Sequence, residues 1–200
     1  MDKKIIITIG RQFGSGGLAV AKELGRKLGL PVYDNELITR AAQESGFSAE
    51  LFVKNDEKKL RFSLASILGG EDSCISESGL FKIQCEAIRR IAEQGSAIMV
   101  GRCSDYVLRD MDCTIDIFLT SPLEIRAERI LERYSVSLDE AMEMIEKKDK
   151  NRSEYYNYYT FGDWGVASTY DLCIDSSLLG IKGTADFIIE YARRRGLIDE

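Results

Sequence analysis

The residues of this chain that are best suited to chemistry are glycines and cations, in a pattern that favours phosphate binding. Gly10–Gly17 is a glycine-rich run between a short apolar segment and a helical pattern. Glycines let the backbone bend so that successive N–H groups point at an anion, and the following helix N-terminus adds partial positive charge. Arg102 and the cations of 147–152 could then supply the charged side chains that phosphoryl transfer requires.

The glycine run matches the usual phosphate loop, G-x-x-x-x-G-K-[ST], only in its second half. Gly14–Gly16 fits, but Gly17 stands where the lysine belongs and Leu18 where its hydroxyl partner belongs. Arg11 occupies the position of the first glycine. A tight strand-to-helix turn without a ligand is the alternative, and the motif by itself leaves both interpretations open.

Asp34 and Arg102 each follow a predicted strand and are further candidates. Asp34 could orient a substrate hydroxyl or hold Mg²⁺ through water, or it could simply cap the following helix. A guanidinium such as that of Arg102 binds phosphate bidentately and stays charged, and the alternative is a surface arginine. We favour phosphate binding for Arg102 because it comes directly after Gly101 at the end of a strand.

A charged run at 147–152 is followed directly by four tyrosines within 155–159. Lys148 and Arg152 could cover a transferred phosphoryl group, and we expect both side chains to be exposed. The tyrosines could stack on a base or close a lid. A solvated helix face for the charges, and packing against the domain for the tyrosines, are the alternative explanations.

The composition excludes several classes of chemistry and partner. The chain has 200 residues, 44% of them hydrophobic, which suits one α/β domain. Because it contains no histidine, Ser–His and Cys–His nucleophilic catalysis is impossible. The net charge of −6 argues against a nucleic-acid partner, and neither a signal peptide nor a membrane span is visible. Five cysteines without C-x-x-C spacing argue against structural zinc and indicate free thiols in the cytoplasm.

Short apolar runs alternate with helical periodicities along the chain. Strands are predicted near 4–9, 30–34, 96–102, 114–119 and 170–174, and helices near 18–28, 35–45, from about 48, 79–93, 121–134, 137–152 and 181–195. Alternation of this kind predicts a parallel five-stranded sheet with helices on both faces. In such sheets ligands bind at the carboxyl ends of the strands, where Gly10–Gly17, Asp34, Arg102 and Thr120 all fall.

Four stretches of the chain, at 9–17, 33–38, 100–108 and 170–177, resemble the bacterial cytidylate kinase-like family in order and spacing. That family is related to the cytidylate kinases, which are P-loop nucleoside monophosphate kinases. The resemblance implies a P-loop NTPase-type α/β fold whose core comprises 1–35, 96–136 and 166–200. It also implies a nucleoside monophosphate-binding insert at about 36–95 and a lid at about 137–165.

The resemblance implies transfer of the γ-phosphoryl group of ATP, with Mg²⁺, to a nucleoside monophosphate such as CMP or dCMP. A nucleotide-binding protein with weak or no turnover, or a kinase with a non-nucleotide acceptor, are the alternatives. Nucleotide or another small phosphorylated molecule would be the partner, without nucleic acid or membrane. The oligomeric state stays open, and no metal-ligating side chains are expected.

The resemblance also assigns roles to individual residues. Donor phosphates would be held by Arg11, Gly14, Ser15, Gly16 and Gly17. The acceptor would be faced by Asp34, Arg40, Arg102, Asp149 and Arg152, with Asp34, Arg102, Lys148 and Arg152 as the catalytic set. Arg129 and Arg133 match cations of the helix before the lid more loosely.

The chain departs from the family pattern in three places. Gly17 replaces the phosphate-loop lysine, Leu18 stands where relatives carry arginine, and Ile145 stands where cytidylate kinases carry a lid arginine. Loss of the loop cation should weaken stabilisation of the β- and γ-phosphates by roughly a hundredfold or more. Either Arg11, Lys22 or the lid lysines substitute for it, or catalysis is poor.

Overall fold

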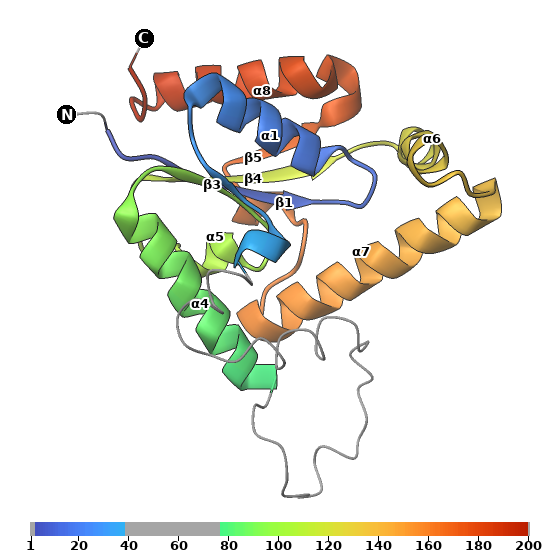
Figure 1. The fold of residues 1–200 in the computed structure, drawn as a ribbon, viewed down its shortest axis with the longest axis horizontal. Coiled ribbons are helices and arrows are strands. Elements are labelled where there is room, and N and C mark those ends of the chain that lie inside the picture. Colours follow the sequence, from blue (N-terminus) through green and yellow to red (C-terminus); the bar gives the residue numbers. More distant parts are fainter. Residues whose placement is uncertain (1–2, 39–76, 200) are drawn as a thin grey trace, which may run out of the picture.

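Five short strands form one parallel sheet in the middle of the molecule (Figure 1). Their order is β2-β3-β1-β4-β5, and all neighbours pair in parallel, which confirms the predicted sheet. The strands are β1 (Ile6–Arg11), β2 (Val32–Tyr33), β3 (Ala97–Val100), β4 (Thr114–Thr120) and β5 (Leu172–Asp175). β1 therefore lies in the centre, and its carboxyl end opens directly into the glycine run.

The computed structural model describes residues 3–38 and 77–199. Most of the predicted insert, including Arg40 and the expected helix from about 48, lies outside these residues. No helix in the described part of the chain is long and apolar enough to cross a membrane.

Helices cover both faces of the sheet, as predicted (Figure 1). α1 (Gly17–Leu28) and α8 (Ser176–Arg194) lie on one face, and α4 (Glu77–Gln94) and α5 (Ser104–Val107) lie on the other. α6 (Leu123–Tyr134) and α7 (Leu138–Thr160) extend beyond the carboxyl ends of the strands, and a short 3₁₀ turn (Ala167–Thr169) precedes β5. α7 thus passes the edge of the sheet where ligands are expected.

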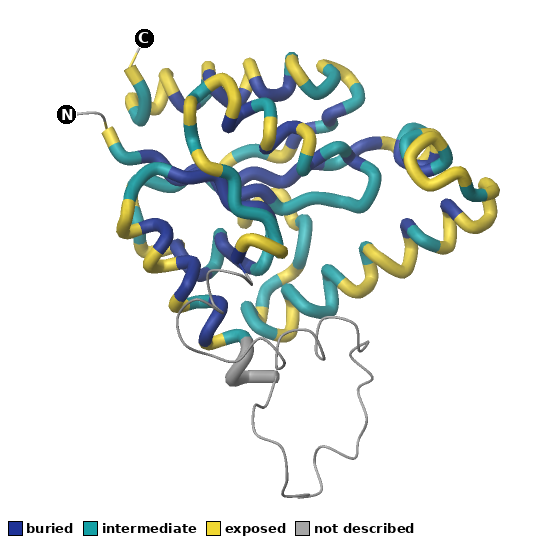
Figure 2. Tube along the Cα trace, viewed as in Figure 1, coloured by how far each residue is buried: buried dark blue, intermediate teal, exposed yellow. Residues whose placement is uncertain are grey.

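The apolar run of β1 is buried on both faces, as Figure 2 shows for the central strands. Ile5, Ile7 and Ile9 pack against α1 and α8, whereas Ile6 packs into a second cluster with α4 and α5. Successive side chains of a strand point to opposite faces, so a strand between two helical layers is apolar at nearly every position. This core fixes where the end of β1 delivers Arg11.

The outer helices differ in detail from the sequence expectations. A capping box formed by Ser137 and Glu140 begins α7, and this helix continues through the tyrosines to Thr160 instead of ending near 152. α8 begins at Ser176, before the expected start at 181, because Asp175 caps it and Gly180 breaks the helix with a φ of 64°. The four-residue helix α5 was not predicted.

The sequence predicts Ser121 as the N-cap of the helix that begins with Pro122, but Ser121 does not cap α6. Pro122 takes the N-cap position without a side-chain bond, and the buried hydroxyl of Ser121 has no hydrogen-bond partner among the described residues. Ser121 and Pro122 separate the end of β4 from the first helical residue, Leu123, so Ser121 lies one residue before the N-cap position.

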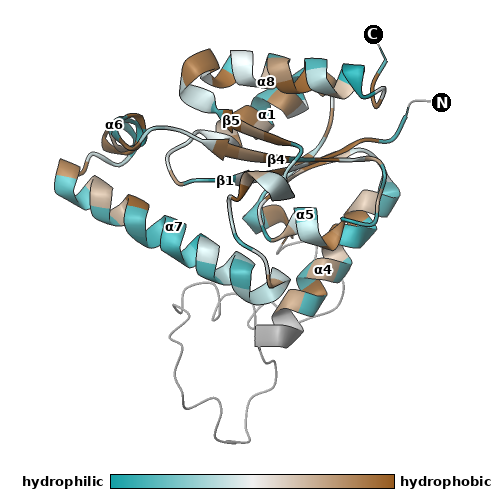
Figure 3. Ribbon diagram, turned by 180° about the vertical axis from the view of Figure 1, so that it is seen from behind, coloured by the Kyte–Doolittle hydropathy of each residue, from teal (hydrophilic) through white to brown (hydrophobic). Residues whose placement is uncertain are grey.

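α6 and α7 pack together through a small apolar cluster that includes Ile130 and Ile145. Ile145, which departs from the lid arginine that the resemblance implied, is 3% exposed and therefore occupies a core position. The remainder of α7 is mostly hydrophilic (Figure 3). Its polar face is therefore available to the pocket described below.

Asp116 on β4 gives a prediction for the pH dependence of stability. Burial raises its pKa to about 6, although the Thr8 hydroxyl donates a 2.6 Å hydrogen bond to its carboxylate. This lies above the value of about 3.9 expected for an unfolded chain, so the charged carboxylate destabilises the fold. Stability should fall as pH rises through this window, and Asp116→Asn should raise the free energy of unfolding at pH 8 by about 1–3 kcal/mol.

Urea unfolding at pH 5 and pH 8 measures this effect. The exposed Asp110→Asn variant is the matched control. If the free energy of unfolding falls equally from pH 5 to pH 8 in Asp116→Asn and Asp110→Asn, Asp116 is not responsible for the pH dependence of stability.

Candidate active site

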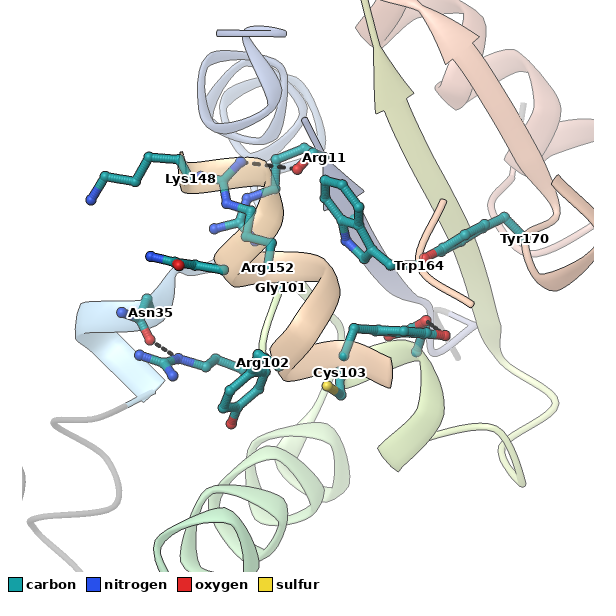
Figure 4. A pocket seen from close by; sticks show the side chains of 14 residues that line it. Arg11, Asn35, Gly101, Arg102, Cys103, Lys148, Arg152, Trp164 and Tyr170 are labelled. Atoms are coloured by element: carbon teal, nitrogen blue, oxygen red, sulfur yellow. Dashed lines mark hydrogen bonds between the residues drawn. The ribbon is translucent and has the colours of Figure 1, made fainter. Parts of the chain in front are cut away.

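A pocket of about 280 Å³ lies at the carboxyl ends of β1 and β3 and is bounded by α7 (Figure 4). Four of the predicted cations line it: Arg11, Arg102, Lys148 and Arg152. They come from β1, from the segment after β3, and from α7, which are far apart in sequence. The sheet topology therefore brings these predicted residues together in one place.

Arg102 enters the pocket from the end of β3, directly after Gly101. Its Nε donates a hydrogen bond to Oδ1 of Asn35, and its guanidinium lies 5.3 Å from the ring centroid of Tyr155 (Figure 4). Its backbone φ is 55°, in the left-handed region, so the chain turns sharply at this residue. The turn and these two contacts orient the guanidinium at the pocket.

Arg152 links α7 to the end of β1, because its Nη1 donates to the carbonyl oxygen of Arg11 at 3.0 Å (Figure 4). Its side chain is only 26% exposed, so the expectation of an exposed side chain is wrong for Arg152 and correct for Lys148. The side chain is covered because the guanidinium also packs 5.6 Å from the ring centroid of Phe13. Burial lowers the pKa of Arg152.

The pKa of Arg11 is lowered by its surroundings in the pocket. Burial lowers its pKa to about 9, and repulsion from Arg152 and Arg102 acts in the same direction. Three guanidinium groups thus face one small volume. A bound anion would relieve the repulsion between them, so the pocket is suited to a phosphate dianion.

The opposite wall of the pocket contains residues that the sequence reasoning missed. The hydroxyl of Tyr156 donates to Oδ2 of Asp105 at 2.8 Å, and burial raises the pKa of Asp105. Trp164 and Tyr170 complete this wall. The tyrosine run was a signal for Tyr156, but only the folded topology places α5 and the 164–170 segment beside it.

The tyrosine run also packs α7 against α4. Tyr155 donates to Oε1 of Gln84 at 2.8 Å, and the ring of Tyr159 stacks on Phe81 with centroids 4.0 Å apart. The packing explanation for these tyrosines is therefore observed, and it holds α7 over the pocket.

Residues 12–17 of the glycine loop lie outside the pocket lining, whereas Gly10 and Arg11 at the start of the loop belong to it. Gly16 caps α1 with a φ of 79°, and no acceptor among the described residues takes the N–H groups of Gly14, Gly16 or Gly17. Ser15, in contrast, is buried and donates through its backbone and its hydroxyl to the carbonyl oxygen of Gln12. Three amides at a helix N-terminus are thus left for an anion, such as a donor phosphate.

Asp149 joins α7 to the glycine loop and does not line the pocket. Its Oδ1 accepts the N–H of Phe13 at 2.6 Å, and its Oδ2 pairs with Nη1 of Arg126 at 2.5 Å. Nη1 of Arg129 donates to the carbonyl oxygen of Gly14 and to Ser176, both at 3.3 Å. The loop is thereby held by two helices, α6 and α7.

We expect Asp149→Ala to lower the free energy of unfolding by about 2–4 kcal/mol, because it leaves the buried guanidinium of Arg126 without its carboxylate. Chemical denaturation measures the change, and Glu146→Ala, at an exposed position on the same helix, is the control. Equal stability of the two variants would show that the pair contributes nothing to the fold.

Asp34 acts as a helix cap in this structure. Its Oδ1 accepts the N–H groups of Glu36 and Leu37, both at 3.1 Å, and residues 35–38 are helical. The capping alternative is therefore observed, whereas a role toward an acceptor stays a prediction. Arg133 is exposed and packs on the ring of Tyr134, away from the pocket lining. Within 3–38 and 77–199, no group of three or more acidic or cysteine side chains could hold a metal ion.

Comparisons with known proteins agree with this geometry. A family model described as the cytidylate kinase-like family matches residues 6–178. The cytidylate kinase of Pyrococcus horikoshii is 30% identical over 182 residues, covering 90% of this chain and 84% of that protein. A crystal structure of an uncharacterized protein from Eubacterium ventriosum is also 30% identical, with a TM-score of 0.72 and coverage of 94% and 98% of the two chains.

The fold itself extends to more distant enzymes. The shikimate kinase of Acinetobacter baumannii, solved with shikimate, has a TM-score of 0.54 at 12% identity, over 96% of this chain and 94% of that one. The parallel sheet with helices on both faces is thus the P-loop kinase fold that the sequence predicted. The family match spans the glycine loop, the Gly101–Arg102 turn and α7, and the chain belongs to the cytidylate kinase-like family.

Proposed function

We propose that this protein transfers the γ-phosphoryl group of ATP to a nucleoside monophosphate such as CMP or dCMP. The observation that carries the proposal is the convergence of Arg11, Arg102, Lys148 and Arg152 on one pocket beside the amides of the glycine loop. Membership of a kinase family supports a nucleotide kinase in general. The concentration of guanidinium groups supports an acceptor that already carries a phosphate.

In this proposal the protein acts mainly by positioning and by charge stabilisation. The N–H groups of Gly14, Gly16 and Gly17 hold the donor phosphates, and Arg102 grips the acceptor phosphate. Lys148 and Arg152 cover the equatorial oxygens of the transferred group from α7, which serves as the lid. Mg²⁺, when bound, neutralises charge on the phosphates.

Two sequence-derived roles complete the acceptor site in this proposal. Asp34 and Arg40 would face the acceptor from the start of the insert, and Asp149 would contact it when the lid rearranges. These roles require Asp149 to exchange its bond to the Phe13 N–H for a substrate contact. Solution of a ternary complex tests that exchange.

A coupled assay with ATP, Mg²⁺ and a panel of nucleoside monophosphates tests the proposal. Turnover of CMP or dCMP above that of an Arg102→Ala variant supports it. Tight nucleotide binding without turnover would instead support a non-catalytic nucleotide-binding protein. The reason to consider this alternative is that glycine replaces the phosphate-loop lysine at position 17. Thermal-shift screening against CMP, dCMP and phosphate-free metabolites separates a non-nucleotide acceptor, because bound ligand raises the melting temperature.

A further inference from the structure

The phosphate loop of this chain carries a cation and a glycine at the reverse of their usual positions. In the motif G-x-x-x-x-G-K-[ST], a glycine stands first and a lysine directly follows the second glycine. Here Arg11 stands first and Gly17 stands in place of the lysine. We propose that these two positions have exchanged roles, so that Arg11 supplies the charge on the transferred phosphoryl group that the lysine supplies elsewhere. The proposal rests on the proposed function and names the cation that the function needs.

Steric contact makes the two positions mutually exclusive. A Cβ placed on Gly17 would lie 2.7 Å from Cβ of Arg11 and 2.9 Å from its Cγ. Real Cβ atoms essentially never approach other heavy atoms within 3.0 Å. A lysine at position 17 therefore cannot coexist with a side chain at position 11 in this backbone. The glycine at 17 is explained by the arginine at 11, and the two departures from the motif are one change.

A second glycine, far away in the sequence, makes room for the same side chain. A Cβ placed on Gly101 would overlap Nη1 of Arg11. Gly17 therefore leaves room for the base of the Arg11 side chain, and Gly101 leaves room for its guanidinium in the conformation that the structure shows.

The charge of Arg11 is retained in an unfavourable environment. Arg102 and Arg152 face it, and burial together with their repulsion lowers its pKa to about 9. A neutral side chain of similar size would fill the same space without this repulsion. A buried cation of this kind is suited to a site that becomes occupied by a polyanion, since the ligand compensates the charge.

Two of the other candidate cations, Lys22 and Arg129, lie outside the pocket lining, and Lys148 enters the pocket from α7 and not from the loop. Lys22 is exposed on α1 and does not line the pocket. Arg129 uses Nη1 to hold the carbonyl oxygen of Gly14 and the hydroxyl of Ser176, which assigns it to positioning the loop. The Arg11 side chain runs from beside Gly17, near its Cβ, to beside Gly101, near its guanidinium, and it lines the pocket.

In the transfer step, an oxygen of the acceptor phosphate attacks the γ-phosphorus of ATP. The bond from that phosphorus to the β–γ bridging oxygen breaks, and its electron pair leaves with ADP. Arg11 stays protonated throughout and donates hydrogen bonds to the non-bridging oxygens of the moving group. It forms no covalent bond and transfers no proton.

The exchange is tested by reversing it. Arg11→Gly and Gly17→Lys, made separately, should each lower kcat by about a hundredfold, the first through lost charge and the second through the clash. The double variant removes the clash and restores a lysine, so its kcat should be at least about tenfold higher than that of either single variant. A double variant that is no better than the worse single variant, or an Arg11→Gly variant with unchanged kcat, would overturn the proposal.

Arg11→Gln separates charge from packing. It should lower kcat about as much as Arg11→Gly, with an unchanged or higher melting temperature, because it removes the repulsion from Arg102 and Arg152. Lys22→Ala, at an exposed position, is the control with unchanged kcat. Equal kcat in Arg11→Gln and the native chain would contradict a role for the charge.

Binding of tripolyphosphate, measured by thermal shift, is the readout that does not depend on turnover. The native chain and the double variant should be stabilised, and Arg11→Gln should not. This pattern without turnover of any monophosphate would reject the proposed function and leave the exchange intact. Equal stabilisation of Arg11→Gln and the native chain, or no stabilisation of the native chain, would reject the exchange itself.

Discussion

Replacing Arg102 with alanine is expected to lower kcat/KM for the nucleoside monophosphate by about a hundredfold to a thousandfold. The guanidinium is oriented by Asn35 and Tyr155 at the end of β3 and faces a pocket that contains two further arginines. Its bidentate donors cannot be replaced by water at the same position, because water carries no charge. The loss should fall mainly on the acceptor, with KM for ATP changed little.

Steady-state kinetics with each substrate varied in turn measures this result. Arg109→Ala is a matched control, since Arg109 is an exposed arginine seven residues later that packs on Tyr106 outside the pocket lining. A similar loss in both variants would indicate a general charge effect, and an Arg102→Ala variant with native kcat/KM would remove this residue from the site.

Replacing Arg152 with alanine is expected to lower kcat about tenfold to a hundredfold while stability changes by less than about 1 kcal/mol. The side chain contributes one hydrogen bond to the Arg11 carbonyl and lies in the pocket. Because burial lowers its pKa, its charge does not stabilise the fold, and removal of that charge offsets the lost hydrogen bond.

Lys150→Ala is the control for this variant, because Lys150 lies on the same helix with a side chain that is 69% exposed. Turnover and urea unfolding are measured on the same preparations. If Arg152→Ala loses stability in proportion to turnover, Arg152 holds α7 in place and does not act on substrate.

The helices and strands could be predicted from the sequence wherever a single local pattern, such as a β-branched run or a capping box, determines the element. The β-branched run before Gly10 and the capping box at Ser137 each specify an element through local chemistry, and both are present. The extension of α7 through the tyrosines was not predictable from periodicity, since those side chains are positioned by α4 and α5. The break at Gly180 inside α8 depends on a left-handed backbone conformation that glycine permits but does not require.

The candidate site was predictable where residues directly follow strands. Arg11 and Arg102 meet because the carboxyl ends of parallel strands share one edge of the sheet. Asp105 could not be found in this way, because its role in the wall depends on a hydrogen bond from Tyr156, 51 residues later. The exclusion between Arg11 and Gly17 is a contact across a turn, which spacing alone does not reveal.

The most direct measurement is a crystal structure of the protein with CMP and a non-hydrolysable ATP analogue. The account predicts that the acceptor phosphate lies within hydrogen-bonding distance of Arg102, and the donor phosphates on the amides of Gly14, Gly16 and Gly17, with Arg11 between them. A donor bound away from the glycine loop, or an acceptor phosphate bound outside the arginine pocket, would contradict it.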